Sequence, residues 1–297
     1  MPWLDYNGRV SPLKLTVLVA LFVPAVWTAW SYWHGDFGAA RPLNEAIHEI
    51  GRWTIRLIFL ALAVTPLARL WSWPRLLLIR RMVGVAAFAY GLVHLSLYVT
   101  QEHFKLATVA SEIVLRIYLT IGFTALMILA ALAATSTDAM VRRLGRSWPR
   151  LHKLVYVAAA LAVVHHFMQS KADVDEPWVM AGLYGWLMGY RILAAVFGRK
   201  TAPLWSVALL SVGAGVLTAI GESLYYWIKL GVSPARVLAA DLALNSIRPG
   251  WVVLAMTLAV TAAMAVRLIA ATWTRRRGGG GRPAYATVSR AARSPLG

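Results

Sequence analysis

Long apolar runs alternate along the chain with short segments that are rich in arginine. About 20 apolar residues cross a bilayer, so the pattern predicts eight membrane-spanning helices. Their approximate bounds are 13–33, 50–70, 82–99, 117–135, 151–168, 178–197, 204–227 and 251–273. The expected fold class is therefore all-α, a polytopic membrane helix bundle in contact with lipid.

Composition and charge support a membrane protein. The chain is 59% hydrophobic and 14% charged, and its net charge is +18, whereas roughly 25% of residues are charged in soluble domains. The arginines cluster between the apolar runs, so we interpret them as topology signals and expect no nucleic-acid partner. The sequence has no cysteine, which excludes disulfides, iron–sulfur clusters and thiolate metal sites.

Basic residues concentrate in every second loop and in the tail. The positive-inside rule predicts that these segments, and hence both termini, are cytoplasmic. The alternate loops are poorer in basic residues, although the last one carries Lys229, Arg236 and Arg248. Residues 233–245 within it are expected to form an amphipathic surface helix. The tail from Gly278 onward has the composition of a disordered segment.

Two intramembrane histidines are predicted to lie at one depth. A histidine inside a bilayer is costly and usually functional. His94 lies 13 residues beyond Arg81 in the third predicted span. His165 lies 13 residues beyond His152 in the fifth. These spans run parallel, so each histidine is roughly 20 Å from the basic entry. Two such imidazoles can clamp a haem from both faces, or they can form a hydrogen bond between helices.

The other histidines leave alternatives open. At 100° per residue, His166 falls about 40° from His152 around the helix, whereas His165 falls about 140° away. The choice between His165 and His166 as a ligand therefore stays open. His152 at the membrane boundary is either functional or a snorkelling polar tip. His48 and His103 lie in or near loops on the far side from the basic entry and are expected to be solvated.

Several motifs, taken jointly, carry a family resemblance over about residues 10–200. They are LAVTPLAR (62–69), RRMVG (80–84), HLSLY (94–98), RIYLTIG (116–122), TSTDAM (135–140), Leu144-Gly145, Trp148, Leu151-His152, Val155-Tyr156 and His165. With these motifs the sequence resembles the MsrQ (YedZ) family. Its members are haem-binding membrane subunits of the bacterial periplasmic protein-methionine-sulfoxide reductase system, with a ferric-reductase-like transmembrane domain.

The resemblance implies a six-helix core that holds haem b, with axial ligands among His94, His152 and His165, and FMN as a second cofactor. It implies a location in the bacterial inner membrane. Electrons would come from a cytoplasmic flavin reductase using NAD(P)H, or from the quinone pool. They would reach MsrP, the periplasmic molybdopterin-containing catalytic subunit, so this subunit would not act on methionine sulfoxide by itself.

The resemblance also implies domain boundaries, and the sequence departs from the family at three positions. It implies a haem-binding domain over residues 10–200, followed by a two-helix extension over 201–273 and a basic tail over 274–297. Neither C-terminal part has an assigned role. Ile117 replaces a proline usual in the family, while His166 and Met168 replace an aromatic residue and a tryptophan. These replacements concern the outer edge of the haem and the choice between His165 and His166.

Residue chemistry agrees with a separate electron donor. The chain has no G-x-G-x-x-G motif after a strand and no soluble nucleotide domain, so hydride chemistry is not expected in it. The short Gly213-x-Gly215 motif is expected to serve helix packing. The alternatives are another haem b redox protein, such as a ferric reductase or quinol-linked cytochrome, and a non-redox transporter. The transporter predicts inverted repeats, and none is visible.

Two sets of arginines are candidates for holding anionic groups, because arginine suits charge-assisted contacts. At the cytoplasmic side, Arg80, Arg81 and His152 are expected to hold the flavin phosphate or to dock the donor. At the opposite side, Arg52, Arg56 and Arg116 are candidates for the haem propionates.

Overall fold

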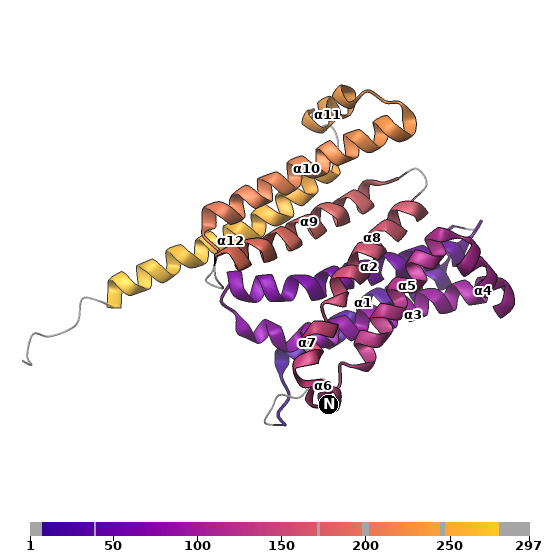
Figure 1. The fold of residues 1–297 in the computed structure, drawn as a ribbon, viewed down its shortest axis with the longest axis horizontal. Helices are drawn as coiled ribbons and strands as arrows, with labels where there is room; N and C mark the ends of the chain where they lie inside the picture. The colour runs from indigo at the N-terminus through magenta and orange to yellow at the C-terminus, as the bar shows by residue number, and fades with distance from the viewer. Residues whose placement is uncertain (1–7, 39, 171–172, 198–201, 244–246, 279–297) are drawn as a thin grey trace, which may run out of the picture.

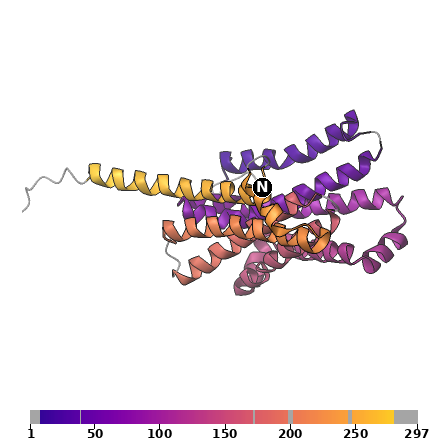
Figure 2. The same cartoon turned by 90° about the horizontal axis from the view of Figure 1, so that it is seen from above.

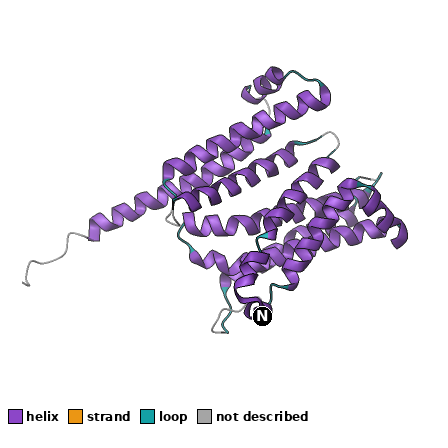
Figure 3. Ribbon diagram, in the orientation of Figure 1, coloured by secondary structure: helices purple, strands orange, loops and turns teal. Residues whose placement is uncertain are grey.

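The described part of the chain consists of helices joined by short loops. The computed structural model describes residues 8–38, 40–170, 173–197, 202–243 and 247–278. Figure 3 shows helices and loops and no strand in these ranges. Seven helices are long and apolar enough to cross a membrane, and a bent pair raises the number to as many as eight. The predicted all-α, multi-pass membrane bundle is confirmed.

The long helices correspond to the predicted spans. They are α1 (Pro12–His34), α2 (Pro42–Leu70), α3 (Arg80–Gln101), α5 (Ile117–Ala134), α8 (Leu154–Gln169), α9 (Asp175–Val196), α10 (Leu204–Leu230) and α12 (Pro249–Gly278). The shorter helices between them are η1 (Pro74–Ile79), α4 (Leu106–Leu115), α6 (Asp138–Leu144), η2 (Gly145–Ser147), α7 (Trp148–Leu151) and α11 (Pro234–Leu242). Helix α11 is the surface helix expected near residue 233. Asn245 and the tail 279–297 lie outside the described residues.

Helix α2 lies at the centre of the bundle. It packs against α1, α3, α8 and α9, while α5 pairs with α8. Helices α9, α10 and α12 lie side by side (Figure 1), and α12 extends beyond the rest of the bundle (Figure 2). We call the end of the bundle that carries Arg75, Arg80 and Arg143 the basic end. The end that carries Glu49 and Glu176 is called the opposite end.

The C-terminal helices are fastened to the bundle by arginine. The guanidinium of Arg248 bridges two carboxylates, Glu222 of α10 at 2.6 Å and Asp241 of α11 at 3.1 Å, and so holds α11 against α10. At the basic end, Arg267 of α12 donates a 2.8 Å hydrogen bond to the carbonyl of Leu70 at the end of α2. Helix termini leave carbonyls without an intrahelical partner, and Arg267 satisfies this one.

The fifth predicted span, over 151–168, corresponds to α8, and the chain bends just before this helix. The segments Asp138–Leu151 and Leu154–Gln169 meet at 51°. Pro149 favours a first helical turn in α7. The Trp148 indole then fixes this turn by donating a 2.8 Å hydrogen bond to the carbonyl of Thr135 at the end of α5. The chain therefore turns before α8 enters the bundle.

A tyrosine hydroxyl forms hydrogen bonds with two backbone groups next to the proline in α1. Pro24 lies inside this helix. The hydroxyl of Tyr90, on α3, accepts a 3.0 Å hydrogen bond from the N–H of Ala25 and donates a 2.7 Å bond to the carbonyl of Leu21. One side chain therefore satisfies two backbone groups of α1 and ties that helix to α3.

Replacing Tyr90 by phenylalanine is expected to lower the free energy of unfolding by about 1–3 kcal/mol, because two backbone groups lose their partner. Thermal unfolding in detergent measures the effect. Tyr32→Phe is the control, because Tyr32 is 44% exposed and lies on α1, the helix that Tyr90 contacts. Equal melting temperatures for both variants would show that the α1 contact contributes nothing to stability.

Candidate cofactor site

The structure brings His94 of α3 and His165 of α8 together. Their ring centroids lie 6.4 Å apart, and the ring planes are nearly perpendicular at 84°. With metal–nitrogen bonds of about 2 Å, two imidazoles on opposite sides of one metal ion have ring centroids roughly 6 Å apart. The observed separation therefore fits a single metal ion between the rings.

Each imidazole is oriented by a carbonyl of a neighbouring helix. His94 Nδ1 lies 2.9 Å from the carbonyl oxygen of Ile47 on α2, and His165 Nδ1 lies 2.8 Å from that of Tyr118 on α5. A carbonyl only accepts, so each Nδ1 carries the hydrogen and each Nε2 keeps a lone pair for a metal. These bonds join α3 to α2 and α8 to α5, so the predicted hydrogen bonding between helices is observed, and it leaves the Nε2 atom of each ring available to a metal. Two neutral, pre-oriented imidazoles are a donor set that fits haem iron.

A glycine beneath each ring makes these contacts possible. Gly51 and Gly122 each follow the accepting carbonyl by four residues. An ideal Cβ at Gly51 would lie 3.0 Å from the Cε1 of His94, and one at Gly122 only 2.7 Å from the Nδ1 of His165. Both rings therefore lie directly on a helix backbone. Sequence reasoning missed this role, although Gly122 closes the RIYLTIG motif.

The other two histidines near this pair have different surroundings. His166 Nδ1 is buried without a hydrogen-bond partner. Its ring interacts electrostatically most strongly with Glu176 and less strongly with His165. The ring that faces His94 is therefore that of His165. His48 lies on α2 and interacts electrostatically with both His94 and His165. It was predicted in or near a loop, and it lies close to the start of α2, which begins at Pro42, with its side chain partly buried. His103 lies in an exposed turn with φ 53°, as expected.

Carboxylates neutralise the arginines at the opposite end. Arg52 forms an ion pair with Glu49. Arg56 lies 2.7 Å from a Glu176 oxygen and 3.8 Å from a Glu49 oxygen. Two guanidiniums thus share two carboxylates, so a haem propionate placed here would have to displace an acidic side chain.

Arg116, between α4 and α5, is also paired. It contacts Glu112 at 2.7 Å and donates a 3.1 Å hydrogen bond to the hydroxyl of Tyr118. The hydroxyl of Tyr98 donates to the same Glu112 carboxylate. Since the Tyr118 carbonyl holds His165, Arg116 helps to fix this part of α5 near the imidazole pair.

The predicted site residues at the basic end lie away from the pair formed by His94 and His165. His152 lies at the bend between α7 and α8, stacked on Trp148 at 3.8 Å between ring centroids. Its Nδ1 lies 3.2 Å from the Trp148 carbonyl and its Nε2 3.4 Å from the Ser136 hydroxyl. Arg81 forms a 2.6 Å ion pair with Asp138. Arg80 is half-buried and interacts with His152.

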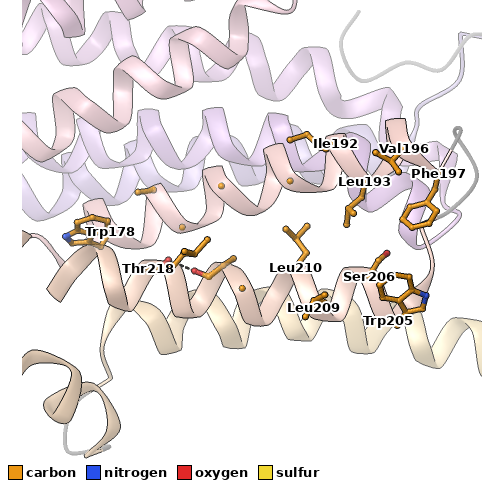
Figure 4. Close-up of a pocket in the computed structure, with 17 residues that line it drawn as sticks. Trp178, Ile192, Leu193, Val196, Phe197, Trp205, Ser206, Leu209, Leu210 and Thr218 are labelled. Carbon is orange, nitrogen blue, oxygen red and sulfur yellow. Dashed lines mark hydrogen bonds between the residues drawn. The ribbon is translucent and has the colours of Figure 1, made fainter. Parts of the chain in front are cut away.

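An apolar groove of about 660 Å³ lies between α9 and α10 (Figure 4). Gly185 and Gly213 border it, and a Cβ at either position would meet nothing within 4 Å. Gly215 instead packs closely on α12, where a Cβ would lie 3.1 Å from the Gly250 carbonyl oxygen. The packing role predicted for the Gly213-x-Gly215 motif therefore holds for Gly215, while Gly213 faces the groove. The Thr218 hydroxyl at the groove donates within its own helix, to Ala214.

A family model matches the central part of the chain. Residues 50–163 match the family described as ferric reductase like transmembrane component. These residues include His94 and His152, both glycines beneath the rings and the Tyr118 carbonyl, and they end just before His165. No solved structure matches the chain.

Three relatives have the name protein-methionine-sulfoxide reductase heme-binding subunit MsrQ. The protein of Rhodospirillum rubrum is 40% identical over 190 residues, covering 63% of this chain and 91% of the relative. That of Xanthomonas campestris pv. campestris strain 8004 is 39% identical, covering 63% and 89%. That of Caulobacter vibrioides is 40% identical, covering 63% and 88%. Because the match extends over nearly the whole of each relative, this chain belongs to the MsrQ family.

Proposed function

We propose that this protein is a membrane electron-transfer subunit that holds a b-type haem between His94 and His165. The single observation that carries the proposal is the pair of imidazoles, 6.4 Å apart and each oriented by a backbone carbonyl. The names of the relatives, which describe haem-binding subunits, support it. A bound haem supplies one-electron chemistry whose potential depends on its axial ligands and surroundings.

The chain's own residues set the conditions for that chemistry. Ile47 and Tyr118 fix the tautomer and the plane of each imidazole through their carbonyls. Gly51 and Gly122 let the rings lie against α2 and α5. Ligands that are held by second contacts need not reorganise when an electron arrives. The protein thus contributes a rigid two-histidine site within the membrane.

We propose that the basic end faces the cytoplasm and that both termini lie there, in the bacterial inner membrane. The arginines at this end follow the distribution expected for cytoplasmic loops. Electrons would enter from a cytoplasmic flavin reductase or from the quinone pool. They would leave at the opposite, periplasmic end for MsrP, a molybdopterin-containing methionine sulfoxide reductase that repairs oxidised periplasmic proteins.

FMN is the second cofactor in the proposal, near Arg80 and His152 at the basic end. Arg81 forms an ion pair with Asp138, which leaves its guanidinium less available for a phosphate and better placed to dock the donor. The C-terminal part over 201–273 is proposed as a separate two-helix extension. It packs on the core through α9 and through the contact from Arg267 to α2.

Electron delivery in reconstituted vesicles tests the function. The purified protein is expected to show a haem spectrum that becomes reduced when NADH and a cytoplasmic flavin reductase, or a quinol, are added. MsrP with methionine sulfoxide is then expected to reoxidise it. The control omits MsrP, and reoxidation should then be slow.

Other outcomes separate the alternatives. Reoxidation by ferric chelates but not by MsrP would favour a ferric reductase. A colourless protein, purified after expression with ample iron and haem precursor, would favour a transporter and contradict the proposal.

A further inference from the structure

Glu222 is a fully buried carboxylate inside a helix that is long and apolar enough to cross the membrane. It lies on α10, about two turns before this helix ends at Leu230, and it is 0% exposed. An ionisable side chain within a membrane span is costly and usually functional. Glu222 was not among the residues predicted from the sequence, and the proposed function gives it no role.

A second buried carboxylate shares one cation with Glu222. Asp241 of α11 is 6% exposed. The guanidinium of Arg248, just before α12, lies 2.6 Å from Oε1 of Glu222 and donates a 3.1 Å hydrogen bond from its Nε to Oδ1 of Asp241. The remaining oxygens, Oε2 of Glu222 and Oδ2 of Asp241, have no hydrogen-bond partner among the described residues.

The charges of this cluster do not balance. In the described part of the chain, the ion pairs give Glu222 and Asp241 no cation other than Arg248. Asp175 of α9 and Tyr226 of α10 also interact electrostatically with Glu222, and neither of them is a cation. With both carboxylates ionised, one negative charge stays uncompensated, and a buried charge of this kind is expensive.

A proton is the ligand that removes this imbalance. Among the described residues, no group of three or more His, Cys, Asp or Glu side chains could hold a metal ion. Glu222 has no exposed surface at which a larger cation could bind. The hydrogen bond from Arg248 favours the ionised form of Asp241, whereas neither oxygen of Glu222 accepts a hydrogen bond from a described residue. Glu222 is therefore the carboxylate that takes the proton.

We propose that Glu222 binds one proton and that this proton fastens α11 to the end of α10. In the protonated state Glu222 is neutral and Arg248 compensates Asp241. Loss of the proton to water leaves an unbalanced negative charge between the two helices. Because the attached state binds the proton more tightly, the attachment of α11 is strongest at low pH and weakens as the pH rises. The site lies outside residues 50–163, which match the family model, and it requires no haem.

The contacts of α11 explain why a single proton can control this helix. Helix α11 has nine residues and lies against the end of α10, at the edge of the bundle (Figure 1). Its buried residues are Val237 and Asp241. The Ser223 hydroxyl donates a 3.1 Å bond to the Pro234 carbonyl, and the Trp251 indole donates a 2.5 Å bond to the carbonyl of Asp241. A short helix held by a small number of contacts can open locally while the rest of the protein stays folded.

Infrared difference spectroscopy of the purified, full-length protein tests the proton directly. The C=O stretch of a protonated carboxyl group lies apart from the bands of carboxylates. We expect this band in the wild type at about pH 7, where a glutamate in water, with a pKa of about 4.3, is ionised. Glu222→Gln should abolish the band. Glu45→Gln is the matched control, because Glu45 is exposed on α2, and it should leave the band unchanged.

Asp241→Asn tests the charge balance, and it keeps the experiment decisive if Glu222→Gln does not fold. In this variant one guanidinium meets one carboxylate, so Glu222 no longer needs a proton for neutrality. The pH at which the carboxyl band disappears should fall by at least about one unit, because a neighbouring like charge has been removed.

A spin label reports whether the proton fastens α11. The sequence has no cysteine, so Leu242→Cys, at a position of α11 that is 74% exposed, gives a single labelling site. The label should become more mobile as the pH rises, and Glu222→Gln should keep it immobile, because glutamine resembles the neutral acid. Ile220→Cys is the control on α10, where the mobility of the label should not depend on pH.

Two results would overturn the proposal. One is a wild type without a protonated carboxyl band at neutral pH, or with a band that neither Glu222→Gln nor Asp241→Asn changes, since Glu222 would then hold no proton. The other is a label on α11 whose mobility stays constant while the band titrates, which would show that the proton does not fasten this helix.

Discussion

His94→Ala is expected to lower the affinity of the protein for haem by more than about 100-fold, because loss of an axial ligand exceeds the effect of losing a partner of a ligand. The imidazole of His94 lies opposite that of His165 and has its Nε2 free. The absorbance of the Soret band per unit of purified protein measures the effect. His165→Ala should have the same result.

Two neighbouring histidines are the controls for these variants. His103→Ala should keep the full haem content, because His103 lies in an exposed turn. His166→Ala should also keep most of it, because its ring interacts with Glu176 and lies beside the pair rather than in it. If His166→Ala loses haem while His165→Ala keeps it, the assignment of the axial ligand on α8 is wrong.

Gly122→Ala is expected to weaken haem binding by about 10- to 100-fold although glycine has no side chain to bind anything. The added Cβ would lie 2.7 Å from the Nδ1 of His165, so the ring must move off the Tyr118 carbonyl. Overpacking of this kind costs about 1–3 kcal/mol. Haem content after dilution and the position of the Soret band measure the loss.

Gly84→Ala is the matched control, since Gly84 lies in the helix that carries His94 and its Cβ would meet nothing within 4 Å. It should bind haem as the wild type does. Equal haem affinity in both alanine variants would mean that the ring of His165 does not need its close contact with α5.

The spans were predictable from the sequence because burial in lipid demands long apolar runs. The same rule gives no signal for segments that change direction. Helix α4 has 10 residues, too few to cross a bilayer. The bend before α8 depends on the bond from the Trp148 indole to the Thr135 carbonyl, a contact between distant residues. Neither feature is encoded in hydrophobic periodicity.

The level of the two histidines in the membrane was predictable from the sequence, but the contacts of their side chains were not. Counting residues from the basic entry places His94 and His165 at one level, and only the packing shows which side of α8 faces α3. The helical backbone under each ring required Gly51 and Gly122, whose role depends on contacts between helices.

A run of arginines in the sequence does not show which of them will pair with a carboxylate in the fold. Arg80 and Arg81 are adjacent in sequence, yet they have different surroundings: Arg81 pairs with Asp138 at the surface, whereas Arg80 is partly buried and takes part in none of the ion pairs among the described residues. A helix turns by about 100° per residue, so adjacent side chains point in different directions. Their roles can be separated only once the neighbouring helices are placed.

The central claim is that two histidines from α3 and α8 hold one haem iron. Low-temperature electron paramagnetic resonance of the oxidised, purified protein tests it most directly. We expect a low-spin haem signal with two coordinated histidine nitrogens in the wild type, and loss of this signal in both His94→Ala and His165→Ala. A wild-type protein without a haem signal, or a double variant of these two residues that keeps the full low-spin signal, would contradict it.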